Sequence, residues 1–264
     1  MLYPMTWNID PIIFKLGFLE IRYYGMFFAS GLFITYYLFA KLAVKDGWKK
    51  DEPDKIFLYI VICLVLGAHF VHIMFYETKS IWENPIRIVQ LGMGLASHGG
   101  AGGAILGAWL FTRRHKKSFL DSVDKVTAAV GLTGAFIRFG NFFNSEIIGR
   151  PTDVSWAIVF KKVDSLPRHP SQLYEGFFLL LMFFIFYPVY KKYHKKLPEG
   201  ATFFAFLIVY FSFRIFAEMF KRYQSEALKA VKASITMGQW LSIPVVIVSL
   251  IMLIIVFKKN KAKN

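Results

Sequence analysis

Two arginines, Arg138 and Arg214, are the residues of this sequence with the clearest chemistry, because each lies inside a largely apolar run. A guanidinium keeps its charge at any physiological pH, so an arginine at membrane depth requires a permanent anionic partner. Its planar fork binds phosphate through two parallel N–H bonds. We therefore predict that both arginines bind the phosphate of a phospholipid headgroup. The alternative is a structural ion pair, for instance between Arg214 and Glu218 at i,i+4.

Further polar residues gather where the apolar run that carries Arg138 ends. The segment FIRFGNFFNSEIIGRPTD, residues 136–153, also holds Asn141, Asn144 and Glu146. Four other apolar runs carry polar residues at the matching end, which are Tyr24, His98, the segment 168–175, and Arg214 with Glu218. Because isolated charges in lipid are costly, we expect these side chains to line one shared cavity near one leaflet.

The segment SHGGAGGAILGA, residues 97–108, places one histidine before a row of small residues. Gly99, Gly103 and Gly107 recur at every fourth position, which favours a close contact between two helices. His98 is either an ordinary residue at a membrane interface or a base that takes a proton from a thiol or hydroxyl. In the second interpretation, Gly99 and Gly100 let a bulky headgroup approach the backbone.

The composition indicates a polytopic membrane protein. The 264 residues are 56% hydrophobic and 18% aromatic, and the apolar residues are bunched. The net charge of +15 does not indicate nucleic acid binding, because the basic residues sit in short clusters beside apolar runs. The single cysteine, Cys63, excludes a disulfide within the chain. His69 and His72 lack companion ligands in their run, so no metal site is expected, and no organic cofactor is implied.

We predict an all-α polytopic membrane protein that forms a single integral membrane domain over residues 1–264. It has seven transmembrane helices and a small polar extracytoplasmic loop at about 144–168. The third predicted helix is rich in glycine, and the fourth ends on charged residues. The predicted spans are about 22–44, 55–75, 95–112, 123–143, 171–190, 201–220 and 238–257.

The lysines and arginines predict the orientation of these spans. Dense basic clusters fall in alternate loops, at about 45–50, 113–117 and 191–196, and at the C-terminal end. The opposite loops carry a sparser scatter of basic residues. The dense set is expected in the cytoplasm, which places the N-terminus outside and the C-terminus inside.

Two polar segments have simple structural interpretations. The segment RHPSQLYE, residues 168–175, is typical of a helix start, with Ser171 as the N-cap. The segment KRYQSEALKAVKASITMGQ, residues 221–239, is interpreted as a solvated connector.

Several of these motifs together resemble one family. The segments RFGNFFNSEIIGRPTD, SHGG, RHPSQLYE, IRYYG and TMGQWLSIP look like those of prolipoprotein diacylglyceryl transferase. The resemblance runs over nearly the whole chain, and its R-x-G-N-F-x-N-x-E-x-x-G-R block is very specific. It implies a bacterial inner-membrane enzyme of seven spans. Such an enzyme moves the diacylglyceryl group of phosphatidylglycerol to the lipobox cysteine of a preprolipoprotein, forming a thioether and releasing glycerol phosphate.

The resemblance also implies roles for individual residues. Its catalytic positions fall on Tyr24, His98, Arg138, Asn141, Glu146, Arg214 and Glu218. Substrate binding is assigned to Gly99, Gly100, Arg138, Asn144, Gly149 and Arg214. The expected partners are phosphatidylglycerol, the signal peptide and lipobox of preprolipoproteins, and membrane lipids. The chain departs from the family at GAHFVHIMFY, where His69 replaces the usual arginine and Val71 the usual glycine.

Two other classes of protein are compatible with single features of the chain. An anion or phospholipid transporter would also use Arg138 and Arg214 as phosphate ligands, but such proteins commonly carry inverted repeats, which are not found here. An intramembrane protease is disfavoured because no serine–histidine nucleophile arrangement is present.

The basic residues yield a topological prediction. In a Cys63→Ser background, cysteines are introduced at Ser118, beside the RRHKK cluster, and at Ser165, in the loop at 144–168. On intact cells, an impermeant maleimide should label the cysteine at 165 and not the one at 118, because the lysine-rich side is cytoplasmic. Labelling at 118 alone would show that the true orientation is the reverse of the predicted one.

Overall fold

The computed structural model describes residues 4–17, 19–78, 83–90, 96–222 and 236–262, and most of them are helical. The described α-helices are α1 (Tyr23–Lys45), α2 (Glu52–Tyr76), α4 (Ser97–His115), α5 (Phe119–Phe143), α6 (Ser171–Tyr193), α7 (Ala201–Ala217) and α9 (Met237–Lys261). Two short 3-10 helices are η1 (Pro85–Val89) and η2 (Glu218–Phe220). Each of the seven predicted spans coincides with one of these helices, with bounds that differ by a few residues.

Six of the helices are long and apolar enough to cross a membrane, if α7 is counted together with η2. The helix outside this group is α4, whose 19 residues contain five glycines and end on Arg113, Arg114 and His115. The prediction of a polytopic helical membrane protein is therefore confirmed. α4 falls outside the six because its glycines lower its hydropathy.

Five short strands accompany the helices, and the sequence analysis did not predict them. They are β1 (Met5–Trp7), β2 (Ile12–Leu16), β3 (Leu19–Arg22), β4 (Ile158–Phe160) and β5 (Pro167–Arg168). β1 pairs in parallel with β4, with Thr6 opposite Val159, and β4 pairs antiparallel with β5. β2 and β3 form a separate antiparallel hairpin. The sheet joins positions about 150 residues apart, a pairing that no local pattern in strands this short specifies.

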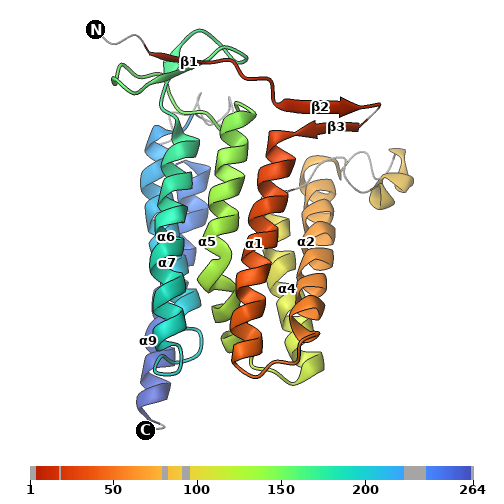
Figure 1. Ribbon diagram of the computed structural model, residues 1–264, viewed down its shortest axis with the longest axis vertical. Coiled ribbons are helices and arrows are strands. Elements are labelled where there is room, and N and C mark those ends of the chain that lie inside the picture. The colour runs from red at the N-terminus through yellow and green to blue at the C-terminus, as the bar shows by residue number, and fades with distance from the viewer. Residues whose placement is uncertain (1–3, 18, 79–82, 91–95, 223–235, 263–264) are drawn as a thin grey trace. The chain divides into compact units, whose positions relative to one another are not determined.

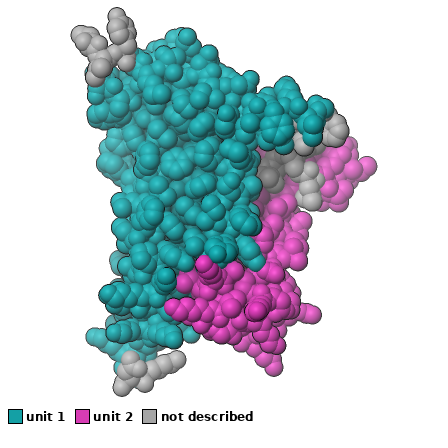
Figure 2. Space-filling view, in the orientation of Figure 1, with its two compact units in different colours: residues 1–38, 126–264 teal, residues 39–125 magenta. Residues whose placement is uncertain are grey.

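The chain divides into two compact units (Figure 2). Unit 1 comprises residues 1–38 and 126–264, and unit 2 comprises residues 39–125, so the boundaries fall within α1 and α5. In unit 1, the strands lie at one end of the helices and the C-terminal end of α9 lies at the other (Figure 1).

Threonines and small residues hold α1 and α5 together in unit 1. The Thr133 hydroxyl donates to the Gly31 carbonyl at 3.0 Å, and the Thr35 hydroxyl donates to the Ala129 carbonyl at 3.2 Å. A Cβ placed on Gly31 would lie 2.7 Å from the Phe136 side chain. This close approach is typical of membrane helices, where association depends on packing and interhelical hydrogen bonds.

The other helices of unit 1 pack around an apolar core. Ala135 of α5, Leu179 and Met182 of α6, and Phe206 of α7 form one buried cluster. The stacked rings of Phe178 and Phe213, with centroids 3.7 Å apart, add to the contact between α6 and α7. Because α5 and α6 share this core, the polar residues at their strand-side ends are held at one depth.

In unit 2, α4 packs on α2 through its glycines. A Cβ on Gly99 would lie 2.2 Å from the Gly67 carbonyl oxygen, one on Gly103 would lie 2.0 Å from the Cys63 oxygen, and one on Gly107 would lie 2.4 Å from the Tyr59 oxygen. The close helix contact predicted from the four-residue repeat is therefore confirmed.

Ion pairs hold the helices of unit 2 together at the end that carries the basic cluster at 113–117. Lys117 contacts Glu52 at 2.9 Å, and its ammonium also lies 4.6 Å from the centroid of the Trp48 ring. Lys125 is buried and pairs with both Asp46 and Asp121. These contacts join the ends of α1, α2, α4 and α5 at this side.

Two neighbouring glycines test the packing of α4 on α2. Gly103→Ala should destabilise the protein by about 1–3 kcal/mol, because the methyl group overpacks against the Cys63 carbonyl. Gly102→Ala is the matched control, since a Cβ there meets nothing within 4 Å. The measurement is the thermal midpoint in detergent, followed by gel filtration. Equal midpoints for the two variants would contradict the proposed contact.

Candidate active site

The C-terminal end of α5 carries the polar group predicted from the sequence. The side-chain amides of Asn141 and Asn144 each donate to Glu146, to its Oε2 and Oε1 respectively, both at 3.1 Å. Their own carbonyl oxygens are buried and accept no hydrogen bond from the described residues. The cluster therefore presents two amide acceptors to any donor that enters, such as a hydroxyl or a thiol.

The turn after α5 has an uncommon backbone. Ser145 and Ile147 have φ values of 56° and 54°, in the left-handed region that non-glycine residues rarely occupy. Such conformations persist only where the surroundings hold them, and they are frequent at functional sites.

The start of α6 holds this turn in place. The Gln172 amide donates to the Glu146 carbonyl at 2.6 Å, and the Ser171 hydroxyl donates to the Ile147 carbonyl at 2.8 Å. The prediction that Ser171 caps α6 was wrong, because the N-cap is Pro170 and makes no side-chain cap. The serine is the first helical residue and binds the neighbouring turn instead.

Gly149 lies where three segments meet. Its amide donates to the His169 carbonyl at 3.0 Å, and its carbonyl accepts from Arg168 Nη1 at 3.1 Å. It also forms a β-bridge with Lys221. A Cβ here would lie 2.3 Å from the His169 oxygen and 2.8 Å from the Phe220 oxygen. The position therefore requires glycine for close backbone approach, which is a structural reason for a residue that we predicted to bind substrate.

Glu175 is the centre of the charges in unit 1. It is 1% exposed, and its carboxylate contacts Arg138 Nε at 2.9 Å and Lys221 Nζ at 2.8 Å. Tyr24 and Tyr210 also interact with the Arg138 guanidinium. A buried carboxylate is tolerated only with such partners. The ion pair that the sequence left open for an arginine therefore exists, but it joins Arg138 to Glu175.

Lys221 extends the cluster to η2 and α9. It is buried, and its ammonium also contacts Glu218 at 3.1 Å. The Thr236 hydroxyl donates to the other Glu218 oxygen at 3.2 Å, and Thr236 opens α9 with a capping box. The connector prediction was wrong for Lys221, whereas residues 223–235 of that segment lie outside the described residues.

Arg214 lies in the last turn of α7 and is partly buried. In the described part of the chain, Glu218 pairs with Lys221 and not with Arg214. The guanidinium interacts electrostatically with Glu175. Within the described residues, Glu218, four residues along the chain, therefore does not form an ion pair with Arg214. The Arg214 guanidinium can bind an anion.

Tyr24, the second residue of α1, lies close to this group. A Cβ on Gly140 would lie 3.0 Å from the tyrosine ring, and the hydroxyl interacts electrostatically with Glu146 and Arg138. Unit 1 thus brings together Tyr24, Arg138, Asn141, Asn144, Glu146, Gly149, Arg214 and Glu218 of the predicted residues. His98, Gly99 and Gly100 belong to unit 2.

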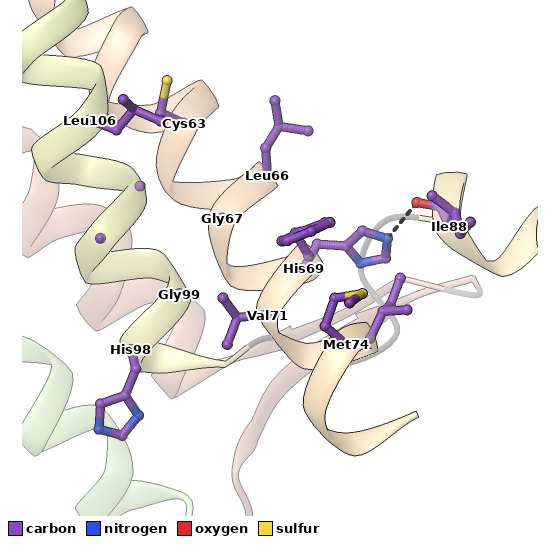
Figure 3. A pocket seen from close by; sticks show the side chains of 14 residues that line it. Cys63, Leu66, Gly67, His69, Val71, Met74, Ile88, His98, Gly99 and Leu106 are labelled. Atoms are coloured by element: carbon purple, nitrogen blue, oxygen red, sulfur yellow. Dashed lines mark hydrogen bonds between the residues drawn. The ribbon is translucent and has the colours of Figure 1, made fainter. Parts of the chain in front are cut away.

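Within unit 2, His98 is exposed at the start of α4, and its ring points away from α2 (Figure 3). Exposure leaves the imidazole accessible to a proton donor. Gly99 and Gly100 are buried in the contact with α2, where a Cβ on Gly100 would meet Ala68 at 3.5 Å. Close packing against α2 is therefore sufficient to explain why glycine occupies positions 99 and 100, whereas packing does not explain the exposed His98.

Sequence reasoning placed Glu175 among the cavity residues but did not identify it as the partner of Arg138, and it missed Lys221. Glu175 was taken as part of a helix start, and Lys221 as part of a loop. They are 46 positions apart, so no short spacing indicates the pair. A usable signal was the position of Glu175 inside the first turns of an apolar helix, where a carboxylate needs a cation.

A second polar group joins the segment before α6 to the first turn of that helix. Trp156 Nε1 donates to the Tyr174 hydroxyl at 2.8 Å, and that hydroxyl lies 3.1 Å from His169 Nδ1. The indole only donates, so the Tyr174 oxygen accepts from it and keeps its own proton and a second lone pair for the contact with Nδ1. Burial lowers the pKa of His169. Nearby, the Arg168 guanidinium holds the pKa of Asp164 below its usual value.

Comparison with known proteins adds the family context. A family model described as prolipoprotein diacylglyceryl transferase matches residues 11–255. The chain is 38% identical over 278 aligned residues to the phosphatidylglycerol–prolipoprotein diacylglyceryl transferase of Bacteroides fragilis, covering 100% of this chain and 99% of the relative.

Two further relatives carry the same name. The protein of Tolumonas auensis is 40% identical over 264 residues, which cover 97% of this chain and 99% of that one. The protein of Chloroherpeton thalassium is 38% identical over 249 residues, which cover 94% and 92%.

The lowered pKa of His169 predicts a pH dependence of stability. As the pH falls below about 6.5, the unfolded chain takes up a proton that the folded His169 resists, so the free energy of unfolding should decrease. In His169→Gln this contribution disappears, and the stability should change less between pH 7.5 and 5. The measurement is urea unfolding in detergent across this range. The prediction does not hold if both proteins show the same pH profile.

Proposed function

Because the chain belongs to the prolipoprotein diacylglyceryl transferase family, we propose that it transfers a diacylglyceryl group from phosphatidylglycerol to the lipobox cysteine of a preprolipoprotein. This reaction is the first step of lipoprotein maturation. The observation that carries the proposal is Arg138, held by a buried carboxylate beside an amide–carboxylate cluster in a protein of this family.

The headgroup phosphate is bound by Arg138 and Arg214. Glu175 contacts Arg138 through Nε, which engages one edge of the fork, and we assign the Nη1–Nη2 edge to the lipid. The ion pair fixes the guanidinium plane before the lipid arrives. Arg214 supplies a cation that Glu218 does not neutralise.

The chemical step is a displacement at carbon. The thiolate of the acceptor cysteine forms a C–S bond with the glycerol carbon that bears the phosphate ester. The C–O bond breaks, and its electron pair leaves on the phosphate oxygen of glycerol phosphate. A free thiol has a pKa near 8.5, so a base increases the thiolate fraction at neutral pH. We assign His98 to this role, and the arginines stabilise the charge on the leaving phosphate.

The remaining site residues position the substrates. The acceptor oxygens of Asn141 and Asn144 suit the hydroxyls of the glycerol headgroup. Tyr24 interacts electrostatically with Glu146 and Arg138, and Glu218 pairs with Lys221. We assign these three residues to keeping the cations of the site in position. Gly149, Gly99 and Gly100 keep the backbone close to its neighbours, and we include them among the substrate-binding positions.

We place the protein in the bacterial cytoplasmic membrane as one membrane domain of seven spans, α4 included. The N-terminus lies outside and the C-terminus in the cytoplasm. The basic clusters support this orientation. In unit 1, β1 and the end of α9 lie at opposite ends of the helices, which supports placing the two termini on opposite sides of the membrane.

A reconstituted assay tests the proposed function. Purified protein is incubated with phosphatidylglycerol and a peptide that carries a signal sequence and lipobox, and the peptide mass is measured. A gain of one diacylglyceryl group, with release of glycerol phosphate, supports the transferase. Movement of lipid or phosphate without a covalent product would instead indicate the transporter that the sequence alone left open.

Conservative substitution of Arg138 tests the assignment of the phosphate. Arg138→Lys keeps a charge for Glu175 but cannot make two parallel N–H bonds, so transfer should fall by about thirtyfold to a thousandfold, or roughly 2–4 kcal/mol. The measurement is transfer rate per folded protein, with folding judged by thermal unfolding and gel filtration. A well-folded Arg138→Lys protein within about threefold of wild type would refute the assignment.

A paired substitution separates phosphate binding from fold support. Arg138→Gln alone leaves Glu175 with one cation fewer, which is destabilising, whereas Arg138→Gln with Glu175→Gln removes both charges and should restore stability. If Arg138 only neutralises Glu175, the double variant regains transfer. If Arg138 binds phosphate, it regains stability but stays inactive.

A further inference from the structure

A short segment is fastened to the end of α2 in unit 2. It comprises residues 83–90, which include η1, and we call it the strap. Figure 3 shows the Ile88 carbonyl of the strap facing the ring of His69 on α2, with the carbonyl oxygen 2.9 Å from Nε2. Ile88 and His69 both line a pocket on α2 and α4. The strap therefore forms one edge of that pocket.

The contact between His69 and Ile88 suits an uncharged ring. A carbonyl only accepts, so Nε2 of His69 carries the hydrogen. The residue is 4% exposed, and its Nδ1 is buried without a hydrogen-bond partner among the residues that the structure describes. A proton on Nδ1 would create a buried charge that has no acceptor there, which is costly. Protonation therefore favours an arrangement in which the ring leaves this position and releases the Ile88 carbonyl.

The strap has a second fastening, which acid does not remove. Arg87 contacts the Glu77 carboxylate through Nε at 2.7 Å and Nη2 at 3.1 Å, and its Nη1 donates to the Gln90 carbonyl at 2.9 Å. A guanidinium keeps its charge, and it holds the pKa of Glu77 below its usual value. His72 Nε2 lies 3.0 Å from the same carboxylate, so a proton on His72 strengthens this fastening. The two fastenings thus respond to acid in opposite directions.

We propose that the strap is a pH-sensitive closure of the pocket. While His69 is neutral, the strap stays closed against α2. When His69 takes up a proton, the strap swings about the pair of Arg87 and Glu77 and opens the edge of the pocket. The closure does not depend on the proposed reaction. In the proposed orientation, this end of α2 faces the outside of the cell, where the pH follows that of the surroundings.

Other titratable groups lie near the strap. Cys63 and His98 also line the pocket, but the His98 ring points away from α2 (Figure 3). An ordinary thiol titrates above about pH 8, outside the range of a histidine. Glu83 of the strap is exposed, and an ordinary glutamate titrates near about pH 4. Among the described residues, His72 is thus the other histidine that contacts a fastening of the strap, and the experiment separates it from His69.

A spin label measures the position of the strap directly. Val89 of the strap is 73% exposed, so a label on Val89→Cys, in a Cys63→Ala background, points into the surroundings. Phe75 on α2 is 78% exposed, and a label on Phe75→Cys is the matched control. Label mobility is measured by electron paramagnetic resonance in detergent between about pH 8 and pH 5.5, where an ordinary histidine titrates. The mobile fraction at 89 should rise about fivefold as the pH falls, the effect of one lost hydrogen bond, and that at 75 should not change.

Two histidine variants identify the group that responds. His69→Gln keeps an N–H donor for the Ile88 carbonyl but has no titrating ring, so the label at 89 should stay immobile at every pH. His72→Gln removes the other ring and should keep the wild-type profile. If His69→Gln does not fold, His69→Asn supplies a shorter amide donor for the same comparison. Equal mobility at both ends of the pH range overturns the proposal, as does a response that survives in His69→Gln and disappears in His72→Gln.

Opening of the pocket is measured separately at Cys63, which lines it. The rate of alkylation by a membrane-permeant maleimide is compared between wild type and His69→Gln at each pH, because their ratio cancels the effect of pH on the thiol. The ratio should be near one at about pH 8 and about fivefold higher at about pH 5.5. A ratio near one at both values overturns the closure of the pocket by the strap. A protein that shows these responses but no transfer keeps the closure and loses the proposed reaction.

Discussion

The ion pairs of Glu175 are the interaction on which the functional part of unit 1 depends. This carboxylate is buried between the Arg138 guanidinium and the Lys221 ammonium. Removing charges from water is costly, and the cost is offset only when each carboxylate has its cations in good geometry. The end of α5, the start of α6 and the segment after η2 are therefore fixed at one depth by one side chain.

The charges of this cluster also determine what it can bind. Arg138 and Lys221 balance Glu175 and Glu218, so the ion-paired group is neutral by itself. Arg214 adds a positive charge, and Glu146, which the Asn141 and Asn144 amides contact, adds a negative one, so the site as a whole carries no surplus charge. Phosphate binding then depends on the directed N–H groups of Arg138 and Arg214.

Backbone contacts give the cluster its rigidity. The turn after α5 receives hydrogen bonds from Ser171 and Gln172. Gly149 accepts a hydrogen bond from Arg168 of β5 and forms a β-bridge with Lys221. Three segments that are far apart in the chain are thus joined within a few residues. In a membrane, where helix association has no hydrophobic driving force, such polar contacts and close glycine packing take over that role.

The sequence alone determined the apolar runs, their bounds and the positions of the arginines, because hydropathy and charge are local properties. It also indicated a close helix contact for α4, since a four-residue glycine repeat specifies one helix face, whereas the identity of the partner helix, α2, came from the tertiary structure. The partner of Arg138 was decided only by the tertiary structure, because Glu175 and Lys221 come from distant segments. The same holds for β1, which pairs with a strand about 150 residues away. It also holds for Ser171, whose hydroxyl donates to the turn after α5 and does not cap its own helix. Each of these three contacts forms between segments that are far apart in the sequence. A local sequence pattern therefore does not predict which buried groups become partners.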